Sequence, residues 1–182
     1  MPASTPLRTE SDRKAEITAL LGAFCFFLSA LEYMVPKPLP FMRLGIANLP
    51  LLIAIDLLPL PWYLALALVK VAGMSLISGS LFSYVALFSL AGTLTAALVM
   101  RGSRKAFGSR VSAVGVSILG ALASNAVQIA IASIVVFGDA ARLVAPPFLA
   151  VGLVTGALLG FFAESFMRRS LWYERVGGAY HA

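Results

Sequence analysis

Long apolar runs with few charges are the feature that most limits what this chain can fold into. Of its 182 residues, 60% are hydrophobic and only 12% are charged. A bilayer core about 30 Å thick requires about 20 apolar residues in each crossing helix. The length therefore allows about six crossings and leaves no room for an extramembrane enzyme domain. We predict an all-α integral membrane protein.

Prolines, glycines and charged residues separate the apolar runs. The predicted crossings cover residues 15–35, 46–58, 62–77, 81–100, 111–137 and 148–166. Together they give a six-helix transmembrane domain at 15–168, between a polar tail at 1–14 and a C-terminal tail at 169–182. The second run is too short to cross unaided, because a helix rises about 1.5 Å per residue.

Basic residues indicate the orientation of these crossings. The stretch 101–110 holds four basic residues and no acid, and Arg168, Arg169 and Arg175 follow the last crossing. Positively charged loops face the cytoplasm. Counting back through four crossings puts the N-terminus on the same side. We therefore expect six transmembrane helices with both tails cytoplasmic.

The stretch 36–50, PKPLPFMRLGIANLP, joins the first two runs and should lie at the outer surface. Its prolines exclude a helix until after the turn. Arg43 and Asn48 stand there among apolar residues, which suggests a ligand site. Alternatively, Arg43 only reaches the lipid headgroups. Glu32, near the end of the first crossing, needs a partner or water, because an isolated carboxylate in hydrocarbon is costly.

The fifth crossing carries the strongest polar signal inside the membrane. Asn125 and Gln128 are three residues apart and share one helix face. Neutral amides donate and accept, so they suit a polar organic ligand better than a bare ion. The alternative is hydrogen bonding between helices. We predict one outward-facing pocket for a polar or anionic small molecule, formed by Arg43, Asn48, Asn125 and Gln128, with Tyr84 and Glu32 as further candidates.

Two other patterns concern packing. Ala15, Ala19 and Ala23 recur every four residues and form a small-residue stripe, where another helix can approach closely. This helix is either a partner's or one of the chain's own. Asp56 and Lys70 flank a tight turn and are predicted to form an ion pair inside the membrane. We expect that pair to lock the fold rather than to bind a ligand.

Several functional classes are excluded by the distribution of charged and reactive residues. The basic residues stand at the ends of apolar runs, which favours contact with anionic membrane lipid over nucleic acid. Cys25 is the only cysteine and His181 the only histidine, so no metal-ligand spacing exists. The acids are scattered, which argues against magnesium-dependent prenyl transfer, and no phosphate-binding loop is present. We expect neither enzymatic activity nor a cofactor.

Two segments carry a family resemblance. PLPFMRLGIANLPLL and SILGALASNAVQIAIA resemble the Gx transporter family, which is also catalogued as heptaprenyl diphosphate synthase component I. That family is similar to the substrate-binding S components of energy-coupling-factor (ECF) importers. The resemblance covers about residues 17–166 and not the tails. Ser124 stands where a histidine is expected in many relatives.

The resemblance implies an S-component-like bundle in a bacterial cytoplasmic membrane. Such a subunit captures a vitamin-like solute at the outer side, and topples within the membrane when a transmembrane coupling subunit and two ATPase subunits act. Its alanine stripe, here Ala15, Ala19 and Ala23, meets the coupling subunit. The alternative is a non-catalytic membrane subunit that docks a polyprenyl- or quinone-related enzyme or an electron-transfer complex.

Overall fold

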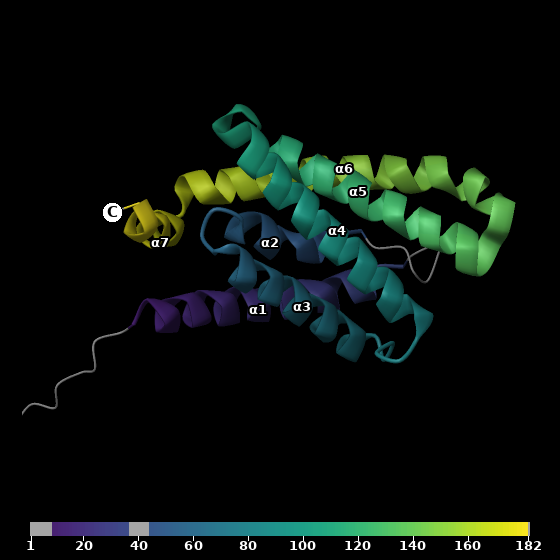
Figure 1. The fold of residues 1–182 in the computed structure, drawn as a ribbon, viewed down its shortest axis with the longest axis horizontal. Coiled ribbons are helices and arrows are strands. Elements are labelled where there is room, and N and C mark those ends of the chain that lie inside the picture. The colour runs from purple at the N-terminus through teal and green to yellow at the C-terminus, as the bar shows by residue number, and fades with distance from the viewer. Residues whose placement is uncertain (1–8, 37–43, 182) are drawn as a thin grey trace, which may run out of the picture.

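The computed structural model describes residues 9–36 and 44–181. Within these ranges the chain is helical and contains no strand. Five helices are long and apolar enough to cross a membrane, so the protein is an all-helical multi-pass membrane protein (Figure 1). These helices are α1 (Glu10–Met34), α3 (Leu60–Ile77), α4 (Tyr84–Phe107), α5 (Ala113–Ala132) and α6 (Ala141–Arg169).

The second apolar run does not form a crossing helix. It folds into a single 3-10 turn, η1 (Ile46–Asn48), followed by the six-residue helix α2 (Leu49–Ala54). Six helical residues rise only about 9 Å, well short of a bilayer core. The described chain thus has five crossing-length helices and one short helix where the sequence predicted six crossings.

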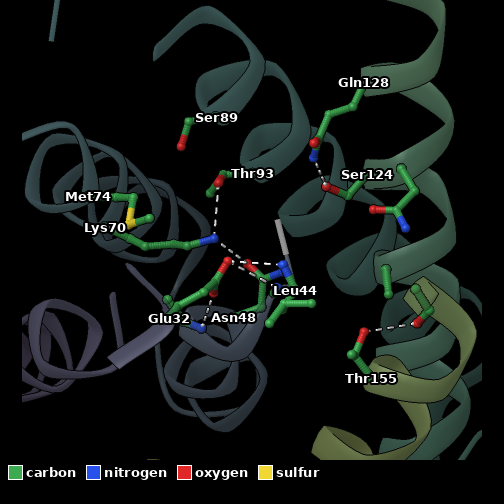
Figure 2. A pocket seen from close by; sticks show the side chains of 15 residues that line it. Glu32, Leu44, Asn48, Lys70, Met74, Ser89, Thr93, Ser124, Gln128 and Thr155 are labelled. Atoms are coloured by element: carbon green, nitrogen blue, oxygen red, sulfur yellow. Dashed lines mark hydrogen bonds between the residues drawn. The ribbon is translucent and has the colours of Figure 1, made fainter. Parts of the chain in front are cut away.

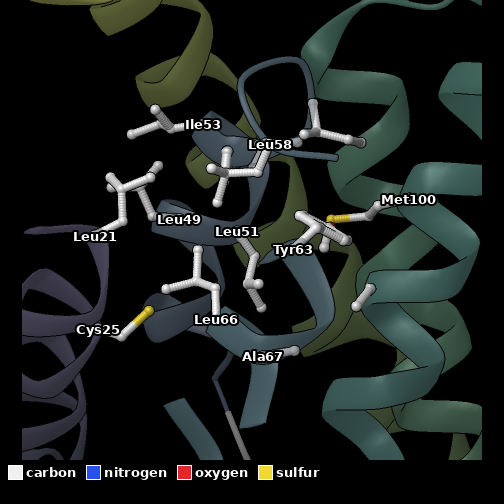
Figure 3. Close-up of a cluster of buried hydrophobic side chains, with 14 of the residues drawn as sticks. Leu21, Cys25, Leu49, Leu51, Ile53, Leu58, Tyr63, Leu66, Ala67 and Met100 are labelled. Carbon is white, nitrogen blue, oxygen red and sulfur yellow. The ribbon is translucent and has the colours of Figure 1, made fainter. Parts of the chain in front are cut away.

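Helix α2 lies in the middle of the molecule, between the α1–α3 pair and the group α4, α5 and α6 (Figure 1). All six of its residues are buried. Figure 3 shows Leu49, Leu51 and Ile53 of this segment within one apolar cluster. The cluster also takes in Leu21 and Cys25 of α1, Leu66 and Ala67 of α3, and Met100 of α4. Helix α2 is therefore surrounded by protein side chains and not by lipid.

Because of the directions in which the helices run, the first and last described residues lie at the same end of the bundle. Figure 1 shows α1 and α3 running the same way, so the chain between them returns along α2. The start of α1 and the C-terminal helix α7 (Leu171–His181) lie at the same end of the bundle.

The predicted C-terminal tail is helix α7, packed on the bundle. Trp172, Tyr173 and Val176 pack against the main apolar cluster. Burial raises the pKa of the Tyr173 hydroxyl to about 12, and the nearby Asp56 carboxylate adds to the shift. Helix α7 therefore covers the turn that follows α2.

Three further boundaries differ from the sequence prediction. Helix α1 begins inside the predicted polar tail, where Thr9 and Asp12 form a reciprocal cap. Helix α4 continues to Phe107, so most of the basic stretch 101–110 is helical. Helix α6 begins at Ala141 and includes Pro146 and Pro147, which were expected to precede it.

The predicted ion pair between Asp56 and Lys70 is wrong. Asp56 lies in the turn after α2, and its Oδ2 is 3.3 Å from a guanidinium nitrogen of Arg104. Lys70 is ten residues into α3, which places it about 15 Å further along the bundle. The sequence placed the two residues at similar depth because it extended the second helix to residue 58.

Arg101 holds the same turn from α4. Its NH1 donates to the backbone carbonyls of Ile55 and Leu58. Its guanidinium carbon lies 5.8 Å from the centre of the Tyr63 ring, a cation–π contact. The basic end of α4 therefore fixes the end of α2.

Candidate functional site

A polar pocket lies among the helices, on the other side of α2 from the Arg101 contacts. Its walls come from α1, the η1 segment, α3, α4, α5 and α6 (Figure 2). The cavity that they enclose is small, about 20 Å³, which is room for about one water molecule. Its main polar side chains are Glu32, Asn48, Lys70, Thr93, Asn125 and Gln128. In a bundle that is otherwise apolar, such a group marks a candidate binding site.

Glu32 builds one wall of the pocket. This side chain is only 2% exposed. Its Oε1 accepts hydrogen bonds from the backbone N–H of Leu44 at 3.0 Å and Gly45 at 3.4 Å, and its Oε2 accepts one from Ala47 at 3.2 Å. A carboxylate that accepts several backbone N–H groups forms strong, charge-assisted bonds. Glu32 therefore holds the 44–47 backbone against α1.

The backbone of this wall depends on Gly45. Its φ of 81° lies in the left-handed region, which glycine adopts without strain. A Cβ at this position would also lie 3.2 Å from Nδ2 of Asn48. The turn that brings Leu44 and Ala47 to Glu32 is thus specific to glycine.

Lys70 enters the pocket from α3. It is buried, and its Nζ donates to Oδ1 of Asn48 and, at 3.0 Å, to Oγ1 of Thr93 (Figure 2). The ammonium therefore joins η1, α3 and α4. A buried cation at membrane depth is costly and is found mainly where it serves a ligand or transport pathway.

Two amides of α5 form the opposite wall. Nδ2 of Asn125 donates to the Phe148 carbonyl of α6 at 2.8 Å, and Nε2 of Gln128 donates to Oγ of Ser124 at 3.0 Å. Gln128 is 1% exposed, and its Oε1 has no hydrogen-bond partner among the described residues. Asn125 thus makes the interhelical bond that the sequence allowed as an alternative, whereas Gln128 retains an unused acceptor.

Glycines bring the neighbouring helices up to these amides. A Cβ on Gly92 of α4 would collide with the Gln128 amide, and a Cβ on Gly152 of α6 would collide with the Asn125 amide. The amide groups therefore lie against backbone on both sides. The pocket is narrow at this wall.

The pocket groups are suited to hydrogen bonding. They comprise one carboxylate, one ammonium, amides and hydroxyls. In the described part of the chain, no group of three or more His, Cys, Asp or Glu side chains could hold a metal ion. Such a set can orient a polar organic molecule through several donors and acceptors at once.

The structure brings together four of the six residues predicted for the site: Glu32, Asn48, Asn125 and Gln128. Tyr84 lies outside this pocket: it is 52% exposed and packs edge-on against Phe88. Arg43 lies outside the described residues.

Sequence reasoning missed Lys70 and Thr93 as pocket residues. Lys70 is the only Lys or Arg in α3, and that isolation was the available signal. It was instead assigned to Asp56, the nearest acid in the sequence. Thr93 carried no signal of its own, because hydroxyls in membrane helices usually bond to backbone carbonyls.

The alanine stripe lies on the outside of the bundle. Ala15, Ala19 and Ala23 are all exposed. They line a shallow apolar groove between α1 and α3, together with Gly22 and Trp62. The described helices of this chain therefore leave the stripe open.

Comparison with known proteins gives one match. The family model described as heptaprenyl diphosphate synthase component I matches residues 21–166. The matched segment runs from α1 into α6 and contains every pocket residue named above. No curated protein and no solved structure matches the chain.

Proposed function

Since the chain belongs to the heptaprenyl diphosphate synthase component I family, we propose that it is the membrane-embedded, solute-binding subunit of an ECF-type importer. It works in a bacterial cytoplasmic membrane with both tails in the cytoplasm. It captures a small, vitamin-like or other polar organic solute from the outer side. A transmembrane coupling subunit and two ATPase subunits complete the importer.

The observation that carries this proposal is the polar pocket. Side chains from α1, η1, α3, α4 and α5 converge on one space inside an apolar bundle. Keeping polar groups at membrane depth costs free energy, which a structural role alone rarely requires at this density. The buried acceptor of Gln128 lacks a partner among the described residues, as expected of a site that awaits a ligand.

A binding role without catalysis fits the same groups. The two charged residues that the structure describes at the pocket, Glu32 and Lys70, each make hydrogen bonds that hold the walls. Neither presents the nucleophile–base pair that covalent catalysis requires. We therefore propose a protein that binds its solute and does not transform it.

Solute binding is tested by the amides of α5. The doubly substituted protein Asn125→Ala, Gln128→Ala should lose affinity for the solute that co-purifies with the unmodified protein. The loss of one such bond in a dry site lowers affinity by about 5- to 150-fold. Mass spectrometry identifies the retained solute, and titration measures its affinity. Unchanged affinity would mean that the amides only hold helices together.

The exposed alanine stripe supports a partner in the membrane. Ala19→Trp and Ala23→Trp should abolish co-purification with a coupling subunit, because a bulky side chain blocks close helix contact. Leu158→Trp is the control, since this residue of α6 is also exposed (64%) but lies away from the groove. Retention of the solute shows that the bundle is intact. Normal recovery of the complex with both alanine variants would contradict the partner role.

The matched family's description favours a second candidate function. It names a component of a heptaprenyl diphosphate synthase, so the chain could be a non-catalytic subunit that docks such an enzyme or an electron-transfer complex. In that case, affinity purification from the native membrane should recover a prenyl-transferring enzyme in place of ATPase subunits. The recovered partner decides between the two functions.

A further inference from the structure

A basic groove lies where α4 ends, α5 begins and α6 ends. Its volume is about 440 Å³, far more than the single water molecule for which the polar pocket has room. Three arginines line it, one from each neighbouring element: Arg104 of α4, Arg110 of the 3-10 turn η2 (Gly108–Arg110) and Arg168 of α6. The groove is therefore large enough and basic enough to take an anionic group.

Contacts of the fold itself hold the walls of this groove. A Cβ on Gly160 of α6 would lie 2.4 Å from Cα of Val114, so α6 passes directly against the start of α5. NH1 of Arg104 donates to the carbonyls of Gly108 at 3.4 Å and Val111 at 3.1 Å. These bonds fix the connection between α4 and α5, and with it the backbone that carries Arg110.

The charges around the groove leave one positive charge in excess. A guanidinium nitrogen of Arg104 lies 3.3 Å from Oδ2 of Asp56, and one of Arg168 lies 2.6 Å from Oε1 of Glu164. Arg110 is exposed and has no acidic partner among the described residues. The formal charges of these five groups sum to +1. A ligand group with a single negative charge would balance them.

The donors at the groove suit a phosphate group. A guanidinium carries five N–H groups in a planar fork that matches the oxygens of a phosphate, so an arginine with one acidic partner still has donors left. Oγ of Ser112 accepts from the Gly115 N–H at 3.2 Å, and its own hydrogen can donate to a ligand. The start of α5 also favours an anion, because the first N–H groups of a helix have no partner within it.

Apolar surface continues from the groove along α6. Val111 and Met167 line the groove itself. Phe161 is exposed and lies seven residues before Arg168, on the same face of α6 and in the direction of the membrane core. A free phosphate ion has no use for such a surface, whereas an acyl chain does. The combination therefore favours a phosphate that carries a lipid tail.

We propose that this groove binds the phosphodiester headgroup of an anionic phospholipid, with Arg110 donating to the phosphate and an acyl chain lying along α6 towards Phe161. Basic pockets between membrane helices on the cytoplasmic side recognise such headgroups. The inference does not depend on the solute-binding function and concerns a different part of the molecule.

Two phospholipids with identical acyl chains test the charge requirement. Phosphatidylglycerol has one net negative charge at its phosphodiester, whereas phosphatidylcholine carries the same phosphodiester with a compensating ammonium. The full-length protein in detergent is titrated with each, and native mass spectrometry measures the bound fraction. Phosphatidylglycerol should bind about 5-fold or more tightly than phosphatidylcholine. Equal binding of the two lipids, or no binding of phosphatidylglycerol, would overturn the proposal.

A matched pair of substitutions connects the preference to the groove. Arg110→Gln should weaken phosphatidylglycerol binding about 5-fold or more. Lys105→Gln removes the same charge from an exposed residue near the end of α4 that does not line the groove, so its effect should stay below about 2-fold. Equal losses for the two variants would show a general attraction of charges and would overturn the site.

A soluble competitor separates a lipid headgroup from a free phosphate. Glycerol 3-phosphate carries a phosphate without acyl chains. Added at the same concentration as phosphatidylglycerol, it should leave lipid binding unchanged, because it gains nothing from the apolar surface of α6. Displacement of the lipid at equal concentration would mean that the groove takes a free phosphate compound, and the lipid assignment would be wrong.

Discussion

Glu32 is a buried carboxylate that organises backbone. It accepts hydrogen bonds from the backbone N–H groups of Leu44, Gly45 and Ala47, which line one wall of the pocket. The acid is therefore a positioning residue, and its effect on a solute passes through the segment it holds. Asn48, which contacts Lys70, belongs to the same segment.

Replacement of Glu32 by glutamine should loosen this wall. A glutamine has one acceptor oxygen and places an NH₂ group against N–H donors, so at least one bond is lost, at a cost of about 1–3 kcal/mol. Amide hydrogen exchange at Leu44, Gly45 and Ala47 should accelerate, and solute affinity should fall. Glu164→Gln, which only loses a surface pair with Arg168, is the control. Unaltered exchange at the three amides would contradict the role.

The sequence predicted Glu32 and the α5 amides better than their partners. A carboxylate at residue 32 had to be satisfied, but its partners are backbone N–H groups, which leave no residue signature in the sequence. Lys70 was assigned to Asp56 because both are charged, whereas the partners the structure shows for it, Asn48 and Thr93, are neutral. Residue type therefore predicted several of the side chains that line the pocket. Their hydrogen-bond partners could not be predicted, because these depend on how the helices pack.

At the scale of elements, α2 is held at both ends from neighbouring helices. Glu32 of α1 fixes the turn before it, and Arg101 of α4 binds the carbonyls of Ile55 and Leu58 after it. The last carbonyls of a helix have no partner within the helix. The Arg101 guanidinium donates hydrogen bonds to such carbonyls in the turn that follows α2.

Replacement of Arg101 by methionine should therefore destabilise the fold. It leaves two partly buried carbonyls without their donor, which costs about 1–3 kcal/mol. Arg101→Lys should recover only part of the loss, because an ammonium cannot reproduce the planar fork of donors. Thermal unfolding in detergent measures both.

The matched control is Lys105→Met, which removes an exposed cation four residues further along α4. Its effect should stay within about 0.5 kcal/mol. Equal losses for Arg101→Met and Lys105→Met would show that the charge of this stretch matters and the carbonyl contacts do not.

Element boundaries show where sequence patterns stop being informative. Apolar runs located all five long helices, because burial in a bilayer requires that composition. The same pattern overestimated α2, since an apolar run buried inside protein looks like one buried in lipid. It also missed α7, whose apolar residues Trp172, Tyr173 and Val176 alternate with charged ones and pack only on one side.

At the scale of the whole molecule, basic residues gather at one end. Arg101, Arg104 and Lys105 of α4 lie at the end of the bundle where α7 packs, as do Arg168 and Arg169 of α6. The α3–α4 connection, with the fully exposed Phe82, lies at the opposite end (Figure 1). The positive-inside rule predicts that the basic end is cytoplasmic.

Cysteine labelling in intact cells tests this orientation. Phe82→Cys should react with a membrane-impermeant thiol reagent from outside, whereas Ala106→Cys, which is also exposed, should react only after permeabilisation. Cys25 is fully buried and should not contribute. Labelling of Ala106→Cys in intact cells would reverse the topology and place the pocket mouth on the cytoplasmic side.

The burial of α2 has a consequence for biogenesis. A six-residue helix without a lipid-facing side chain gains little by leaving water for lipid alone. Its favourable surroundings exist only once α1, α3 and the later helices stand beside it. Yet α1 and α3 cross in the same direction, so the segment between them must return through the bilayer. The ribosome delivers this segment before α6, one of the helices it packs against, has been made. We therefore expect α2 to reach its final position only after α6 has been synthesised.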